Sequence, residues 1–286
     1  MKTKIVSFNL FGLDVSIYTY GTLIVVGFLV GAWWLRRAAE RTLGVDRERS
    51  FNVAFALLFL GLFGARLCYA IAHYEEFART PLKFLKIWEG GLLLFGGVAL
   101  ASLWLAWWLP RKPEMRGFAL ADLLARATCL ALAVGWMAPL LAGDDFGKPT
   151  TLPWGIPAAA YEDGSPASLW AIKTDVPLAS LHPTQVYEAL FALALFFGLG
   201  LLGKRARVSG RVLAAFFVAM AVGRAALDLF RGDGGPAAKV ADRGFVVPGV
   251  LSWTQFLAIP LAFAGVALWL IRRPGAAPAS PPPRAP

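Results

Sequence analysis

Arg224, Asp228 and Arg231 are the residues of this chain whose types and spacing most clearly permit chemistry. They lie in an apolar run that otherwise has the composition of a membrane-spanning helix. Residues three and four positions apart share one face of a helix, so we expect these charges to lie together. Because charge inside a bilayer is costly, such residues usually face a protein interior or a wet cavity. The pattern favours a buried cationic site that holds an anionic group.

The composition is that of an integral membrane protein. The 286 residues are 58% hydrophobic and 16% charged, whereas a soluble domain is closer to half apolar and a quarter charged. The net charge of +10 fits the Lys and Arg excess of cytoplasmic loops better than nucleic-acid binding, so we expect no nucleic-acid partner. Two cysteines in apolar runs and two histidines do not suggest a metal site, and we expect no cofactor.

Seven apolar stretches approach the length of about 20 residues that a membrane-spanning helix needs. They are residues 17–35, 51–72, 91–109, 118–142, 184–202, 211–231 and 250–271. Lys and Arg are more numerous after the first, third, fifth and seventh stretches, and the positive-inside rule makes that side cytoplasmic. We therefore expect an all-α polytopic transmembrane bundle with its N-terminus outside and its C-terminus in the cytoplasm.

The segments outside these stretches complete the expected organisation. We expect residues 1–273 to form a single transmembrane domain. Residues 143–183 contain several prolines and acids and are too long for a plain connector, so they should form a loop or small head on the outer face. The tail, residues 274–286, is rich in Pro and Ala and should be a disordered cytoplasmic extension.

Five motifs, taken in order, resemble those of bacterial prolipoprotein diacylglyceryl transferases. They are Tyr20-Gly21 with Gly27; Gly64-Ala65-Arg66-Leu67-Cys68-Tyr69; Trp88-Glu89-Gly90-Gly91 with Phe95-Gly96-Gly97; His182-Pro183-Thr184-Gln185-Val186-Tyr187-Glu188; and Gly223-Arg224 with Asp228 and Leu229-Phe230-Arg231-Gly232-Asp233. Ser252 and Gln255 in the last stretch also fit. Each motif alone is weak. Their order, their spacing and the seven-span frame together indicate this family over nearly the whole chain.

The resemblance implies a multi-pass enzyme of the bacterial inner membrane. It would move the diacylglyceryl group of phosphatidylglycerol to the lipobox cysteine thiol of a lipoprotein precursor. A thioether forms and glycerol phosphate leaves. The partners implied are therefore phosphatidylglycerol, the precursor signal peptide and the lipid bilayer. The attacking sulfur must become a thiolate, and the leaving phosphate needs cations, for which arginine is well suited.

The positions that match the family motifs supply the predicted site. We predict His182, Glu188 and Asp228 as catalytic residues. The predicted substrate-binding residues are Tyr20, Arg66, Gly147, Gln185, Tyr187, Arg224 and Arg231. His182 is one of two imidazoles and is the remaining proton acceptor for a thiol, although a histidine before a proline is often a local structural hydrogen bonder. Glu188 is expected to pair with Arg66 or Arg224.

The chain departs from the family in its central polar groups. The family signature G-R-x-G-N-F-x-N-x-E-x-x-G corresponds to residues 135–147, where Trp136 replaces the arginine and Pro139 the first asparagine. Ala142 replaces the second asparagine and Asp144 the glutamate. The histidine of a family His-Gly-Gly motif is Phe95.

Two interpretations of these departures stay open. The chain is either a divergent transferase, whose remaining polar groups have taken over the missing roles, or a degenerate paralogue. The paralogue would bind an anionic phospholipid or a membrane partner without transfer. Intramembrane charge alone also permits a transporter, although the sequence shows no inverted repeat.

Overall fold

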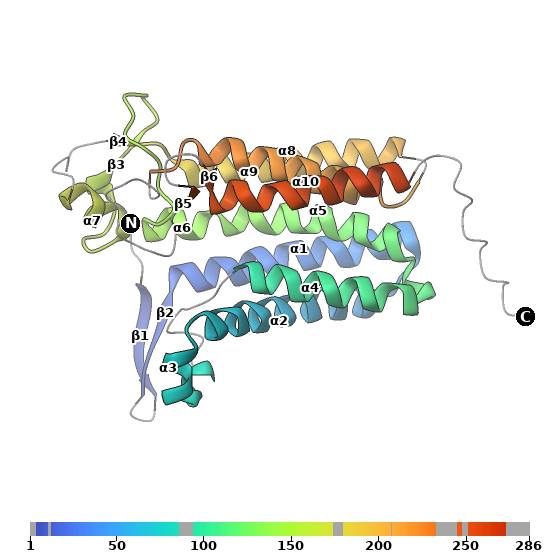
Figure 1. Ribbon diagram of the computed structural model, residues 1–286, viewed down its shortest axis with the longest axis horizontal. Helices are drawn as coiled ribbons and strands as arrows, with labels where there is room; N and C mark the ends of the chain where they lie inside the picture. The colour runs from blue at the N-terminus through green and yellow to red at the C-terminus, as the bar shows by residue number, and fades with distance from the viewer. Residues whose placement is uncertain are drawn as a thin grey trace, which may run out of the picture. The chain divides into compact units, whose positions relative to one another are not determined.

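The computed structural model describes residues 4–10, 13–85, 94–173, 180–206, 208–232, 245–247 and 251–272, and the chain is mostly helical (Figure 1). It divides into two compact units, called here the first and the second unit. The first unit comprises Met1–Gly31 and Ala125–Pro286, and the second comprises Ala32–Leu124. Each unit is described by itself below.

Long helices overlap all seven stretches predicted from hydropathy. They are α1 (Thr19–Leu43), α2 (Arg47–Ala72), α4 (Leu94–Trp108), α5 (Gly117–Gly135), α8 (Thr184–Arg205), α9 (Arg211–Asp228) and α10 (Trp253–Ile271). Short helices and 3-10 turns connect them: α3 (Tyr74–Arg79), η1 (Pro81–Leu85), η3 (Leu109–Arg111), η4 (Pro113–Met115), α6 (Met137–Ala142), η5 (Ala158–Ala160) and α7 (Pro166–Lys173).

Four helical segments are both long and apolar enough to cross a membrane. They are Thr19–Leu43, Arg47–Ile71, Gly117–Ala142 and Thr184–Arg205, and a shorter apolar helix covers Ala258–Ile271. Large apolar side chains on these helices are exposed, for example Phe59 at 62%, Phe197 at 60% and Phe263 at 72%. Such surfaces suit contact with lipid chains and not with water. The prediction of a polytopic helical membrane protein is confirmed in this coarser form.

Two predicted helix boundaries were wrong. The stretch 211–231 does not continue as helix to its end: α9 stops at Asp228, and Arg231 enters an extended bridge with Gly147. Arg231 therefore does not share a face of α9 with Arg224. The stretch 118–142 is interrupted at Trp136, because Pro139 has no N–H to continue the hydrogen bonding of α5. Pro139 instead lies in the first turn of α6, where a backbone N–H has no partner within the helix and is not needed.

Short antiparallel sheets also depart from the all-α expectation. They pair β1 (Lys4–Leu10) with β2 (Leu13–Tyr18), β3 (Ile156–Pro157) with β4 (Ser180–Leu181), and β5 (Phe245–Val247) with β6 (Leu251–Ser252). In the first of them, Phe8 lies opposite Val15 and Ser7 opposite Ser16. Its strands place β-branched and aromatic residues in alternation with polar ones, which favours a strand over a helix.

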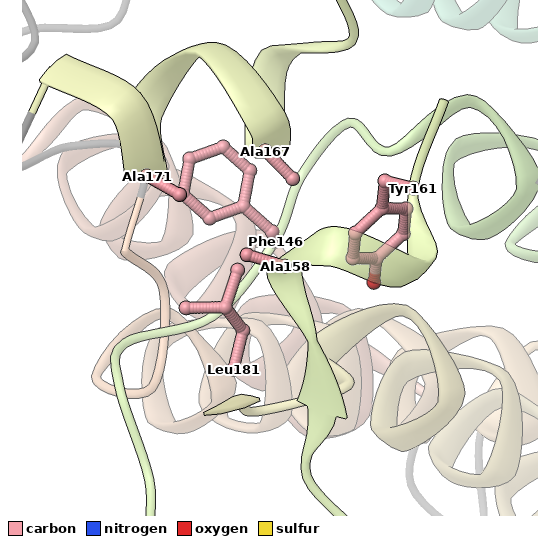
Figure 2. Close-up of a cluster of buried hydrophobic side chains, with 6 residues drawn as sticks. All are labelled: Phe146, Ala158, Tyr161, Ala167, Ala171 and Leu181. Atoms are coloured by element: carbon pink, nitrogen blue, oxygen red, sulfur yellow. The ribbon is translucent and has the colours of Figure 1, made fainter. Parts of the chain in front are cut away.

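A small hydrophobic core lies within residues 143–183 of the first unit. The buried members from η5, α7 and β4 are Ala158, Ala167, Ala171 and Leu181, and Phe146 and Tyr161 join them from the intervening loops (Figure 2). The ring of Trp170 packs on Phe146 at 5.6 Å between centroids. This segment is therefore a folded head with its own core, which can hold the loop at 144–148 in a fixed place.

Helices α2 and α4 of the second unit lie side by side and touch at glycines (Figure 1). A Cβ atom at Gly64 would lie 2.5 Å from the backbone oxygen of Gly96, and one at Gly97 would collide with the backbone of Gly61. Only hydrogen fits at these positions, so the two backbones are in direct contact. The glycines of the Gly64-Ala65-Arg66 and Phe95-Gly96-Gly97 motifs therefore have a packing role.

Candidate functional site

The first element of the candidate site is an ion pair between α8 and α9. The Arg224 guanidinium donates to the Glu188 carboxylate, which lies one turn into α8 and is only 4% exposed. The ring of Trp136 lies 5.0 Å from the same guanidinium. Gly223 leaves room for the Phe191 ring, with which a Cβ atom at this position would collide. Of the two partners expected for Glu188, the structure shows Arg224.

The second element is an ion pair that the sequence analysis did not predict. Arg231 donates to the carboxylate of Asp145 at 2.5 Å. Asp145 has a positive φ of 53°, which aspartate tolerates better than most residues. The available signal was the doublet of acids at 144 and 145, of which only Asp144 aligns with a family acid.

Backbone hydrogen bonds fix the segments that carry this second pair. The N–H of Gly147 donates to the carbonyl of His182 at 3.0 Å, and that of Lys148 donates to Phe230 at 2.8 Å. A Cβ atom at Gly147 would lie 2.5 Å from the His182 oxygen. Gly147 is thus required for the close approach of three backbone segments, and its binding of substrate stays a prediction.

The first turn of α8 anchors the same loop through buried side chains. Thr184 Oγ1 donates to the Asp145 carbonyl at 2.6 Å, and Gln185 Nε2 donates to the Asp144 carbonyl at 2.5 Å. Both side chains are buried. Burial also raises the pKa of the neighbouring Tyr161 to about 12, while the Gln185 side chain acts in the opposite direction. Gln185 therefore positions backbone here, and its contact with substrate stays a prediction.

His182 and Tyr187 form a hydrogen-bonded aromatic group beside the two ion pairs. Trp154 Nε1 donates to the Tyr187 hydroxyl at 2.7 Å, and His182 Nδ1 lies 3.1 Å from the same oxygen. The Phe230 ring packs edge-on against both, at 5.4 Å from His182 and 6.1 Å from Tyr187. Because Nδ1 of His182 faces the Tyr187 hydroxyl, Nε2 is the ring nitrogen that can exchange a proton with another group.

Two further predicted residues lie at helix ends of the first unit. Asp228 is the last residue of α9 and is partly buried, but the partner of Arg224 is Glu188 and not Asp228. Tyr20 lies in the first turn of α1 and is 44% exposed. Their catalytic and substrate-binding roles stay predictions.

Arg66 belongs to the second unit and is held there by backbone. It is 2% exposed, and its guanidinium donates to the carbonyls of Lys83 at 2.5 Å and Phe84 at 3.1 Å. The rings of Phe77 and Tyr69 lie 5.2 and 5.9 Å from the guanidinium. These contacts support the turn at η1. The binding of substrate by Arg66 stays a prediction.

Several sequence predictions fall outside the described part of the chain. They concern the Trp88-Glu89-Gly90-Gly91 motif, Asp233, the tail at 274–286, and the side chains of Phe95 and Ser252.

A comparison with known families decides which family has this site. The family described as Prolipoprotein diacylglyceryl transferase matches residues 6–271. The chain belongs to this family.

Relatives in the family carry the name phosphatidylglycerol–prolipoprotein diacylglyceryl transferase. The protein of Yersinia enterocolitica serotype O:8 / biotype 1B is 30% identical over 274 residues, which cover 91% of either chain. That of Chromohalobacter salexigens is 30% identical over 263 residues, covering 91% of this chain and 90% of its own. That of Clostridium tetani is 28% identical over 274 residues, covering 94% and 98%.

Within the prolipoprotein diacylglyceryl transferase family, the replaced residues of this chain take structural roles. The Trp136 ring lies against the Arg224 guanidinium, and Pro139 is buried in α6. The site therefore combines two arginines with two carboxylates, and each arginine has an acidic partner.

Proposed function

We propose that this chain transfers the diacylglyceryl group of phosphatidylglycerol to the cysteine thiol of a lipoprotein precursor. The observation that carries the proposal is the pair of arginines, Arg224 and Arg231, each held by a carboxylate; Arg231 pairs with Gly147, which hydrogen bonds to His182. Family membership supplies the reaction, and the relatives' names supply the lipid. The geometry supports arginines that bind phosphate and a histidine that accepts a proton.

The arginines bind the phosphodiester of the lipid. Each guanidinium in its present state donates to a carboxylate, either Glu188 or Asp145. A phosphate presents the same planar acceptor pattern as a carboxylate, so it can share or replace these partners. In the proposed mechanism, the acids keep the arginines oriented in the absence of lipid, and the arginines stabilise the charge that develops on the leaving glycerol phosphate.

His182 accepts the proton of the thiol. With Nδ1–H donating to the Tyr187 oxygen, the Nε2 lone pair faces away from that contact and takes the proton. The thiolate sulfur then attacks the glyceryl carbon that carries the phosphate. The new S–C bond forms as the C–O bond breaks, and glycerol phosphate leaves with the electron pair. Trp154 and Tyr187 are positioning residues in this scheme because they act through the imidazole.

A second candidate function is phospholipid binding without transfer. It is favoured by the neutral pairing of both arginines and by the contact between Trp136 and Arg224. A site that is already neutral has less positive charge to stabilise a departing phosphate. This alternative makes the same prediction for lipid binding but predicts no thioether product.

The decisive experiment is a transfer assay with purified protein. The protein is incubated with phosphatidylglycerol vesicles and a lipobox peptide, and the peptide mass is measured. We expect the mass gain of one diacylglyceryl group on the cysteine peptide and none on a matched serine peptide. Failure of the folded protein to modify the peptide, together with failure to rescue cells depleted of their own transferase, would overturn the transfer proposal in favour of lipid binding alone.

Substitution of Arg224 tests the binding step separately. We expect Arg224→Ala to weaken retention of phosphatidylglycerol in native mass spectrometry, whereas Arg224→Lys should retain part of it because the charge remains. Unchanged retention in Arg224→Ala would contradict the assigned role.

We further propose the arrangement of the chain in the membrane. Seven crossings place the N-terminus outside and the C-terminus in the cytoplasm of a bacterial inner membrane, with residues 1–273 as one transmembrane domain. The four long apolar segments, the shorter α10 helix and the apolar helices α4 and α9 support this number, and the Lys and Arg distribution supports the orientation. Residues 143–183 form the outer head. Reporter fusions after residues 165 and 207 should report opposite sides.

A further inference from the structure

The second unit contains a hollow of about 480 Å³ that the proposed transfer reaction does not use. Its volume is within the range of roughly 300–1,000 Å³ typical of small-molecule sites. The residues that line it all belong to α2, α4 and the turns that follow α4: Arg49, Asn52, Val53, Ala56, Trp104, Trp108, Lys112, Glu114 and Met115.

The hollow lies towards the end of α4 that is distant from the glycine contacts. The two backbones touch at Gly61 and Gly97, and Trp108 lies about 16 Å further along α4 at 1.5 Å per residue. At that end, large side chains line the hollow. Trp104 and Trp108 stack at 5.1 Å between centroids and form one wall, and Met115, which is 2% exposed, is buried at the base.

The polar side chains of the hollow are available for a ligand. Arg49, Asn52, Lys112 and Glu114 form no hydrogen bond or ion pair through their side chains with any residue that the structure describes. Neighbouring cations behave differently. Arg47 pairs with Glu40 at 2.6 Å, and Arg111 lies over the Trp107 ring at 4.5 Å. Two cations and one acid give the hollow a formal charge of +1.

Exposed apolar side chains occupy the same turns of α2 and α4. Phe55 is 54% exposed and Phe59 62%, and Leu103 and Trp107 are 69% and 56% exposed. Acyl chains of a lipid whose headgroup sits in the hollow would have these surfaces to lie against. Tryptophan is also the residue that membrane proteins concentrate at the level of lipid headgroups.

We propose that this hollow binds the headgroup of an anionic phospholipid, with its phosphate between Arg49 and Lys112. Arginine and lysine both bind phosphate, the first as a planar donor and the second as a point charge. The end of α1, the start of α2 and the α4–α5 connection carry basic residues that the positive-inside rule places in the cytoplasm. Basic pockets between helices on that side are suited to anionic headgroups. The site shares no residue with the Arg224 and Arg231 site.

The test compares two variants with the same change in net charge. The double variant Arg49→Gln/Lys112→Gln removes both cations of the hollow, and the control Arg41→Gln/Lys204→Gln removes two exposed cations outside it. Native mass spectrometry counts bound phosphatidylglycerol per chain, with phosphatidylcholine of matched acyl chains as the lipid control. We expect the hollow variant to bind one phosphatidylglycerol roughly ten-fold or more weakly, and the control to bind as the wild type does. Equal binding by all three proteins would overturn the proposal.

A third variant separates a built site from general attraction. Trp104→Leu keeps both cations and removes part of the aromatic wall, so it should weaken the same lipid. Lipid binding that depends on charge but is unchanged in Trp104→Leu would show attraction at the surface and overturn the proposal.

A parallel arm adds inorganic phosphate in place of lipid. Protection against thermal unfolding by phosphate, without protection by phosphatidylglycerol, would assign the hollow to a soluble anion and overturn the lipid proposal. Transfer activity should persist in Arg49→Gln/Lys112→Gln. Lipid binding in the hollow can therefore be disproved while the transfer function stands, and the transfer function can be disproved while lipid binding in the hollow stands.

Discussion

The arginines of the two units donate to different groups: backbone carbonyls accept from Arg66, and carboxylates accept from Arg224 and Arg231. Arg66 of the second unit donates to the backbone carbonyls of Lys83 and Phe84. Arg224 of the first unit donates to a carboxylate, and so does Arg231. Their charge is compensated before any ligand arrives. A count of cations at membrane depth therefore does not measure the positive charge that a phosphate would meet.

This difference determines which partner a phosphate would have to replace at each arginine. A phosphate that reaches Arg224 or Arg231 replaces one anion by another, so the cost of removing the carboxylate offsets part of the gain. At Arg66, a guanidinium that moves to a phosphate leaves the carbonyls of Lys83 and Phe84 without this donor, so the local backbone loses support. The following predictions test this contrast, beginning with the largest effect.

Breaking the buried pair of the first unit should be the most costly change. Arg224→Gln leaves the Glu188 carboxylate, which is 4% exposed, without its cation, and we expect a loss of about 3–5 kcal/mol in the free energy of unfolding. The double variant Glu188→Gln/Arg224→Gln should recover most of this loss, because no charge is left uncompensated. Unfolding in mixed micelles measures both.

The exposed pair of Arg47 and Glu40 provides a matched control. Its side chains are 52% and 42% exposed, and Arg47→Gln should therefore change the free energy of unfolding by at most about 1 kcal/mol. Equal losses in Arg47→Gln and Arg224→Gln would remove the basis for treating the buried pair as special.

Loss of the Arg66 guanidinium should have an intermediate effect. Arg66→Met leaves the carbonyls of Lys83 and Phe84 without their donor, which costs about 1–3 kcal/mol. Arg66→Lys keeps the charge but cannot donate in the same forked geometry. If Arg66 also binds substrate phosphate, Arg66→Lys should keep more lipid than Arg66→Met at equal stability. Equal lipid retention in both, measured by native mass spectrometry, would leave Arg66 a purely structural role.

The partly exposed pair should show a smaller change. The side chains of Arg231 and Asp145 are 16% and 20% exposed, and we expect Asp145→Asn to lower the free energy of unfolding by about 1 kcal/mol. Asparagine is chosen because it also tolerates the positive φ at this position. A loss as large as that of Arg224→Gln would mean that the two pairs are equally desolvated, which contradicts the difference in burial.

A neutral buried group should show the smallest effect, and only at high pH. Burial raises the pKa of Tyr161 to about 12 from a usual value of 10.0, so its contribution to stability is complete below pH 10. It is lost as the pH rises towards 12, because the unfolded chain ionises first. At pH 10.5 the loss is about 0.8 kcal/mol. Tyr161→Phe should show a smaller decline in stability between pH 10 and 12 than the wild type.

Periodicity and hydropathy were sufficient to predict where the helices lie. Each long helix overlaps a predicted apolar stretch because burial of apolar surface, in protein or lipid, determines these segments. The ends were harder to predict. Arg231 left the helix because backbone pairing with Gly147 competes with the last turn of α9, and no local pattern announces a partner that is distant in the sequence.

The candidate site was predictable in part. Glu188 was expected to pair with Arg66 or Arg224, and the structure pairs it with Arg224. Asp145 was missed because only Asp144 matches the acid of the family signature. The role of Asp145 also depends on a positive φ that sequence spacing does not reveal. Trp154 was missed for a similar reason, since its contact with Tyr187 spans most of the head.

The backbone ladder around Gly147 has a mechanical consequence for the head. Residues 146–148 hydrogen bond to the segment before α8 and to the segment after α9. Hydrogen bonds, and not a covalent cross-link, therefore hold the start of the head to its end. A protease cut at the exposed residues 162–164 would divide the polypeptide into fragments that stay associated. Asp145 would then belong to one fragment and Arg231 to the other, and the nicked protein should still migrate as a single particle.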